Sequence, residues 1–369
     1  MFAAMTEGLK ANFPVVIPYV GIFLRDHWDQ VTNQPWWTIH VWDIPARLRV
    51  EEDLQRKLDL DWVPCGMCPS REWRENHGVE TLGDSVFLMD TLSGERKEIW
   101  REPISGTRIP IDKESLIKSL KDVDKQIVIT KEEDLTQSGR LDYARTMVEN
   151  FGSEKFICSS IGTPYWIALD HYFGFKGMMI NLFRKPQLVE RVLEKITACT
   201  VEELRAYAKA GVDGIWIEEC LGSADVISLA HFERFALPYV KVVISEIRRL
   251  KMKSIYYPCG DVRDRLEPMI EAGPDCISLE ESKKGFEIDI AWVHRVVAGR
   301  TCILGNLDAV GVLQNGTRTE LEKEIRRQLN VGREFGRFIM SLGSPVTPGT
   351  PLPRVREYVN IVRRESANI

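Results

Sequence analysis

Short apolar runs alternate with amphipathic stretches of helical length through the second half of the chain, and this rhythm constrains the fold more than any other feature. Parallel βα units are the arrangement that such alternation favours. Five runs rich in β-branched or other apolar residues serve as predicted strands: Asp213 to Ile217, Ser254 to Tyr257, Cys276 to Leu279, Cys302 to Leu304 and Phe338 to Ser341.

Three further runs upstream, at Val15 to Val20, Leu60 to Val63 and Phe156 to Ser160, bring the predicted strands to eight. Eight parallel strands are the number that closes a barrel. We therefore predict an α/β fold, a (β/α)8 TIM barrel, forming a single domain over residues 1–369.

Helix signals agree with this prediction. Pro186 begins a stretch of apolar residues at helical spacing that ends near Gly211. Thr317 and Glu320 have the spacing of a capping box at the start of another helix.

A different pattern occupies residues 71–115, where alternating residues and Gly turns replace the helical rhythm. The run DSVFLMDTLSGERKEIW predicts a β-hairpin with its turn at Ser93 and Gly94. We expect this N-terminal β-hairpin insertion to lie outside the barrel.

Charge and cysteine usage narrow the classes of partner. The net charge of −5, without long Lys or Arg runs, gives no support for nucleic acid or an anionic membrane surface. Pro14 and Pro18 interrupt the apolar N-terminal stretch, which we interpret as a barrel strand and not a signal or membrane segment.

Eight scattered cysteines favour reduced thiols and a cytoplasmic protein, and Cys65-Gly-Met-Cys68 has no second CxxC to make a metal site. A homo-oligomer stays an open alternative.

Several phrases in the right order resemble the uroporphyrinogen decarboxylase superfamily across roughly residues 15–362. They include AGVDGIWIEEC, ISLAHFERFALPYVKVVI, YYPCGD, EAGPDCISLEES, ILGNLDAVGVL and GSPVTPGTPLPRVREYV. The resemblance implies a TIM barrel. It also implies one of two activities, a decarboxylase or a methyltransferase that works with a corrinoid protein.

The decarboxylase motifs are missing. The Arg-rich N-terminal motif and the C-terminal Gly-His-Gly of such enzymes correspond here to GIFLRDHWDQ and LGSPVTPG. A porphyrinogen carries several carboxylates and needs several cationic anchors, for which only Arg25 and Arg108 are candidates in the first third of the chain. The resemblance therefore favours the methyltransferase branch.

The zinc ligands of that branch are only partly present. A His-x-Cys pair and a later Cys in the relatives correspond here to Tyr257-Pro258-Cys259 and to Ser344. Several carboxylates at neighbouring strand ends would repel one another or require a cation. We therefore predict a zinc ion held by Glu219, Cys259 and Glu280. The alternatives are ion pairing of Glu218 and Glu219 to Arg or Lys, and an ordinary buried role for Cys259.

Other residues at predicted strand ends are candidates for catalysis and binding. Tyr257, Asp261 and Glu218 are the predicted proton donors. The predicted substrate-binding residues are Trp36, Trp37, His40 and Asn306, although ordinary packing of the Trp cluster, and a structural role for Asn306 in the strand-end turn, remain open.

The resemblance, taken with these residues, implies one function and leaves two alternatives. The prediction is a methyltransferase that moves a methyl group from a small donor, favoured to be an aryl methyl ether, to the Co(I) corrinoid of a partner protein. The alternatives are a decarboxylase or lyase that acts on a smaller acid, and a non-catalytic barrel. The donor and the direction of transfer are not fixed by the sequence.

Overall fold

The barrel is built from a parallel sheet of seven strands. The computed structural model describes residues 1–101, 113–283 and 285–367. Its main sheet has the order β1-β5-β6-β7-β8-β9-β10, so each strand pairs with the next one along the chain apart from the intervening β2–β4. These strands are β1 (Trp62–Cys65), β5 (Phe156–Gly162), β6 (Gly214–Glu219), β7 (Lys253–Pro258), β8 (Cys276–Ser278), β9 (Cys302–Leu304) and β10 (Phe338–Ile339).

The eighth predicted strand, Val15 to Val20, forms only an isolated parallel bridge between Val15 and Met340. It nevertheless occupies the gap between the two edge strands. Val16 N–H donates to the Met340 carbonyl at 3.0 Å, and Asp61 N–H donates to the Val15 carbonyl at 3.1 Å. Pro14 and Pro18 have no N–H group to extend the ladder, which explains why the segment is so short. The curled sheet confirms the TIM-barrel prediction, with one strand reduced to a bridge.

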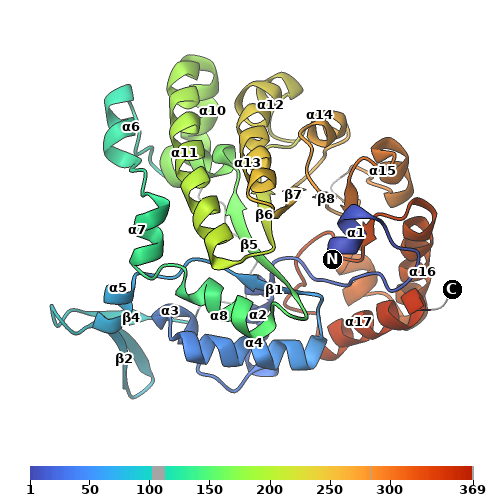
Figure 1. Ribbon diagram of the computed structural model, residues 1–369, viewed down its shortest axis with the longest axis horizontal. Coiled ribbons are helices and arrows are strands. Elements are labelled where there is room, and N and C mark those ends of the chain that lie inside the picture. The colour runs from blue at the N-terminus through green and yellow to red at the C-terminus, as the bar shows by residue number, and fades with distance from the viewer. Residues whose placement is uncertain (102–112, 284, 368–369) are drawn as a thin grey trace.

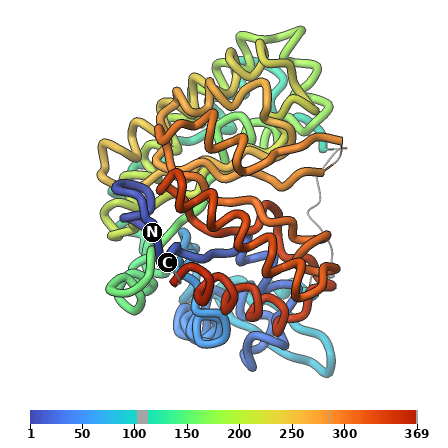
Figure 2. Tube along the Cα trace, turned by 90° about the vertical axis from the view of Figure 1, so that its right-hand side faces the viewer, coloured from blue at the N-terminus to red at the C-terminus, as the bar shows by residue number. Residues whose placement is uncertain are grey.

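Helices surround this sheet (Figures 1 and 2). Those before β6 are α1 (Phe2–Thr6), α2 (Val20–Val31), α3 (Thr38–Val41), α4 (Ile44–Leu58), α5 (Arg71–Asn76), α6 (Leu120–Gln126), α7 (Glu132–Gln137), α8 (Asp142–Phe151), α9 (Pro164–Ile167), η1 (Ala168–Phe173), α10 (Gly174–Arg184) and α11 (Pro186–Ala210). Those after β6 are α12 (Leu229–Phe235), α13 (Leu237–Arg249), α14 (Leu266–Glu271), α15 (Ile290–Val297), η2 (Ala309–Gln314), α16 (Arg318–Phe335) and α17 (Leu352–Ala367).

Two predicted helix boundaries are confirmed in detail. Helix α11 begins at Pro186, and Gly211 follows its last residue with φ of 85°, a left-handed conformation that glycine adopts without a steric penalty. At the start of α16, Thr317 N–H donates to Glu320 Oε2 at 2.7 Å, and Glu320 N–H donates to Thr317 Oγ1 at 3.2 Å. These reciprocal bonds satisfy backbone donors that the helix leaves unpaired.

The inserted hairpin has one strand more than predicted. Strands β2 (His77–Leu82), β3 (Ser85–Asp90) and β4 (Arg96–Ile99) form a separate antiparallel sheet. Figure 1 shows it projecting beside α5, outside the barrel. The predicted turn joins β3 to β4, where Gly94 has φ of 72°. The first turn, at Gly83 and Asp84, was missed because its flanking residues are largely polar and exposed.

Candidate active site

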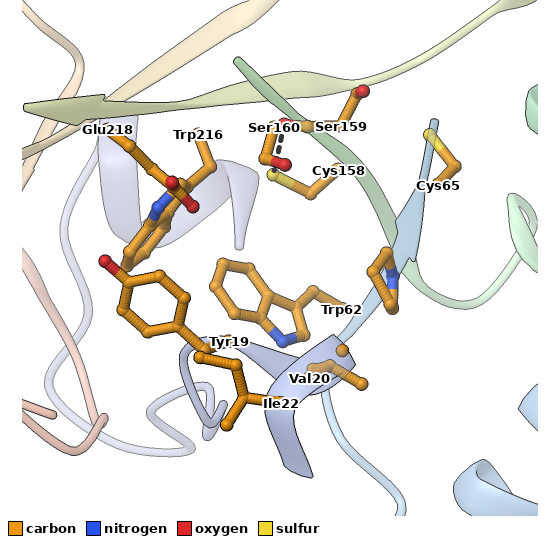
Figure 3. Close-up of a pocket in the computed structure, with 12 residues that line it drawn as sticks. Tyr19, Val20, Ile22, Trp62, Cys65, Cys158, Ser159, Ser160, Trp216 and Glu218 are labelled. Atoms are coloured by element: carbon orange, nitrogen blue, oxygen red, sulfur yellow. Dashed lines mark hydrogen bonds between the residues drawn. The ribbon is translucent and has the colours of Figure 1, made fainter. Parts of the chain in front are cut away.

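A cavity of about 340 Å³ enters the barrel between the start of α2 and strands β1, β5 and β6. Figure 3 shows the side chains that surround it. Its lining residues are Tyr19, Val20, Gly21, Ile22, Trp62, Pro64, Cys65, Cys158, Ser159, Ser160, Trp216 and Glu218. The lining is mainly apolar and aromatic, as in sites that bind small organic molecules.

Aromatic rings pack together along one side of this cavity. Trp216 stacks on Tyr257 with ring centroids 4.8 Å apart, and Trp62 meets Trp216 edge-on at 5.4 Å. Tyr19 approaches both Trp216 and Tyr257 edge-on, at 6.2 and 5.6 Å. These arrangements hold the rings in fixed positions, so the cavity has rigid aromatic walls.

Tyr19 owes its position to an unusual backbone conformation. Its φ of 53° and ψ of 48° lie in the left-handed region, which a residue with a Cβ atom adopts at a cost of about 1 kcal/mol. The segment turns sharply there, from its extended course between the edge strands into α2. This turn sets the Tyr19 ring against the rings of the barrel interior.

Glu218 is the carboxyl group that lines the cavity. Burial raises its pKa to about 7, and a hydrogen bond from the Trp216 side chain partly offsets that effect. Trp216 and Glu218 lie two residues apart on β6, so alternation along the strand places both on the same face. At neutral pH this carboxyl group is therefore divided between its protonated and ionised forms.

Glu219 points to the opposite face of β6, by the same alternation. It is buried, and neither carboxylate oxygen has a hydrogen-bond partner among the described residues that meets normal geometry. Burial raises its pKa to about 8, while Thr163 and Arg265 partly offset the shift. Glu219 is separated from the cavity that Glu218 lines.

The two acids that follow β8 share one lysine, and burial still raises the pKa of Glu281. Lys283 Nζ lies 2.8 Å from Glu280 Oε1 and 3.8 Å from Glu281 Oε1. The same ammonium group donates to Ser344 Oγ at 2.7 Å. Glu280 Oε2 also accepts a hydrogen bond from Gly260 N–H at 2.9 Å. The crowded carboxylates thus obtain their cation from the chain itself.

The predicted zinc ligands are therefore not brought together. Glu219 lies on the far face of β6, and Glu280 is held by Lys283 and Gly260. Cys259 lies instead beside Cys220, with the two sulfur atoms 3.4 Å apart. Across the described ranges, no group of three or more His, Cys, Asp and Glu side chains is arranged to hold a metal ion. Sequence spacing could not reveal the opposite orientation of Glu219 relative to Cys259, nor the partner Lys283.

The other predicted proton donors have partners of their own. The Tyr257 hydroxyl is buried and donates to the Gly343 carbonyl at 3.1 Å, and burial raises its pKa. Asp261 pairs with Arg263 at 2.7 Å, which lowers the pKa of the carboxyl group.

The predicted substrate-binding residues lie in two other places. Asn306 Nδ2 donates to the carbonyls of Glu280 and Ile288 at 3.1 and 2.8 Å, so it bridges two loop segments. Trp36 packs edge-on against Trp37 and His40. Trp37 lines a second pocket, of about 520 Å³, between the α3–α4 region and β2. None of these four side chains is among the residues that line the barrel cavity.

The cationic anchors weighed for a decarboxylase are also absent from the cavity. No Lys or Arg occurs among the described residues that line it. Arg25 pairs with the adjacent Asp26 at 2.7 Å. Arg108 lies outside the described residues.

Comparison with protein families decides where the chain belongs, because the uroporphyrinogen decarboxylase family model matches residues 104–365. The chain belongs to the uroporphyrinogen decarboxylase family. Two similar relatives are methylcobamide:CoM methyltransferases. One, from Methanosarcina acetivorans, is 26% identical over 60% of this chain and 62% of its own length; the other, from Methanosarcina mazei, is 26% identical over 67% and 69%. A uroporphyrinogen decarboxylase from Chlorobaculum parvum is 27% identical over 53% of this chain and 54% of its own.

A solved structure supports the fold. A methyltransferase from Methanosarcina mazei superimposes with a TM-score of 0.67 at 19% identity, covering 98% of this chain and 96% of that one. The fold and family predictions are thereby confirmed, and the relatives include both methyltransferases and decarboxylases. Among the described helices, none has both the length and the apolar character needed to cross a bilayer.

Proposed function

We propose that this protein transfers a methyl group from a small methyl donor to the cobalt of a corrinoid carried by a partner protein. Family membership and the two methylcobamide:CoM methyltransferase relatives support this class of reaction. We further propose an aryl methyl ether as the donor, which makes the reaction an O-demethylation.

The observation that carries the proposal is the pairing of aromatic walls with one unneutralised carboxyl group in the same cavity. Trp62 and Trp216 offer edges and faces against which a substrate ring can pack. Glu218 has a pKa of about 7 there, so a large share of its population carries a proton at neutral pH. An aryl ether has both features that these groups complement, a flat ring and an oxygen that must leave.

Glu218 would assist the departure of that oxygen. The Co(I) corrinoid of the partner would supply the nucleophile for the methyl carbon. As the carbon–oxygen bond breaks, both bonding electrons stay on the oxygen, and the Glu218 proton passes to it to give a neutral phenol. A phenol has a pKa of about 10, so the carboxyl group is the stronger acid and the transfer is downhill.

Trp62, Trp216 and Tyr19 would orient the donor. Rigid walls would hold the ring so that its oxygen faces Glu218. Zinc has no part in this proposal, since Glu280 is engaged by Lys283 and Gly260, and Glu219 faces away from Cys259.

The decarboxylase alternative receives less support from this cavity. The described residues that line it include no Lys or Arg to bind the carboxylate of a substrate acid. The unneutralised Glu218 would also repel such a substrate.

The test is a single-turnover reaction of the purified protein with reduced cobalamin and a methoxyphenol. The proposal predicts methylcobalamin and the free diphenol in equal amounts, at a rate well above that without protein. A parallel incubation with aromatic and aliphatic carboxylic acids would detect released carbon dioxide. Carbon dioxide release without methyl transfer would replace the proposal with the decarboxylase function, and no reaction in either assay would favour a non-catalytic barrel.

A further inference from the structure

Two thiols lie in contact at the edge of the barrel mouth. Cys220 directly follows the last residue of β6, and Cys259 directly follows the last residue of β7. Their sulfur atoms are 3.4 Å apart. The Tyr19 hydroxyl lies 3.8 Å from Cys259 Sγ. All eight cysteines are free thiols in this structure.

The backbone geometry is suited to a bond between these thiols. The parallel ladder pairs Glu218 with Tyr257 and Glu219 with Pro258, and Cys259 N–H continues it by donating to the Glu219 carbonyl at 3.0 Å. Cys220 and Cys259 are the next positions in this register. Adjacent strands lie about 4.8 Å apart, which is inside the Cα separation of roughly 4.4–6.8 Å that disulfides span.

Accessibility separates this pair from another pair on the same sheet. Cys276 and Cys302 are also register partners, on β8 and β9, but both are fully buried. Cys220 and Cys259 are partly exposed. An oxidant in solution can therefore reach Cys220 and Cys259 but not Cys276 and Cys302.

We propose that Cys220 and Cys259 form a redox-active dithiol, a modification site that low-molecular-weight disulfides oxidise reversibly. Cys259 attacks the small disulfide and releases one small thiol, which leaves a mixed disulfide. Cys220 is the second thiol to react, because its contact with Cys259 and its burial raise the pKa of its thiol. Cys220 then attacks that mixed disulfide and releases the second small thiol. The protein loses two electrons and two protons, and the small disulfide gains them as two thiols.

Closing the disulfide changes the cavity next to it. The sulfur atoms must approach from 3.4 Å to about 2.05 Å. Cys259 Sγ is one of the two atoms that can move, and it contacts the Tyr19 hydroxyl, whose ring lines the cavity. Oxidation is expected to weaken binding of an aromatic ligand in the cavity by about tenfold, and a reducing agent restores it. The dithiol itself does not depend on the proposed methyl transfer.

The experiment is a thiol count in denaturant after equilibration of the folded protein with oxidised glutathione. The eight thiols of the reduced chain should fall to six, without attached glutathione, and peptide mass spectrometry should find Cys220 linked to Cys259. A count that stays at eight, or a link between other cysteines, would overturn the proposal. Binding of a methoxyphenol, measured on both forms by Trp fluorescence, reports the effect on the cavity without any assay of activity.

Two variants control this measurement. Cys220→Ser removes one partner, so it should form no internal disulfide and should instead retain glutathione on Cys259, which a reducing agent releases. Cys199→Ser removes a partly exposed thiol elsewhere and should still lose two of its seven thiols. An internal disulfide in Cys220→Ser would show that other thiols react. If that variant fails to fold, the linked peptide from the wild-type chain still decides the question.

Discussion

The barrel mouth, the rim where the strands end, has one half at β6 and another after β8, and the acidic residues of the two halves have different surroundings. In the half formed by β1, β5 and β6, Glu218 lines an aromatic cavity and has no ion-pair partner among the described residues. In the half that follows β8, Glu280 and Glu281 share Lys283. Carboxyl groups at the same edge of one sheet therefore differ in whether a loop brings a cation beside them, although burial raises the pKa of Glu281 as well. Chemistry is expected where the cation is missing.

The largest effect is expected from Glu218→Gln. Loss of the proton donor should lower the rate of methyl transfer about 10²- to 10³-fold, while donor affinity changes less than about threefold. Single-turnover rates and ligand titration measure the two quantities. Glu281→Gln, from the other half, should keep the rate within about threefold. Equal losses in both variants would remove the distinction between the halves.

Lys283→Met tests the other half. It leaves two largely buried carboxylates without their cation, which should lower the free energy of unfolding by about 2 kcal/mol, less than for a fully buried pair because Lys283 is partly exposed. Urea unfolding at pH 7 measures this, with Lys283→Arg as the control that keeps the charge. Wild-type stability in Lys283→Met would mean that the ion pairs contribute nothing.

Trp216→Leu tests which of two aromatic groups binds the donor: the rings around Trp216 in the barrel cavity, or the rings around Trp37 near the second pocket. Removal of this wall should raise the dissociation constant of a methoxyphenol about tenfold, through lost ring contacts. Trp37→Leu, in the second pocket, should change it less than twofold. Isothermal titration calorimetry measures both. A larger loss in Trp37→Leu would restore the sequence-based prediction that Trp37 binds substrate.

The smallest effect concerns the two faces of β6. The pKa of Glu219 is raised from 4.5 to about 8, so the folded protein holds this proton more tightly than the unfolded chain does. Between these pKa values, stability falls as pH rises, and it is highest below about pH 4.5. Relative to Glu219→Gln, the wild type should lose about 1 kcal/mol between pH 5.5 and pH 6.5. Urea unfolding across this range checks the sign, and a wild type that gains stability relative to the variant would refute it.

The fold could be predicted from the sequence because the spacing of apolar residues reflects which segments form strands and helices. Seven of the eight predicted strands occur, and the eighth failed only in extent, since Pro14 and Pro18 cannot donate to a ladder. Helix ends at Gly211 and Thr317 were predictable because capping depends on a few neighbouring residues. The extra strand of the insertion, β2, was not predictable, because its residues are mostly polar.

The site was less predictable, because it depends on contacts between distant segments. Glu218 was a candidate, and Trp216 could have been found with it, since both lie on one face of β6. Tyr19 lines the cavity because of a left-handed backbone conformation, which the sequence around it does not predict. Lys283 was overlooked because its distance to Glu280 depends on how the loop after β8 folds.

The pH dependence of single-turnover methyl transfer from a methoxyphenol to reduced cobalamin tests the role of Glu218 most directly. With a pKa of about 7 for Glu218, the wild-type rate should be constant at acidic pH and should decline, approaching tenfold per pH unit, above pH 7. Glu218→Gln should be slow and lack this decline. A wild-type rate that rises through pH 7, or the same decline in both proteins, would contradict Glu218 as the proton donor.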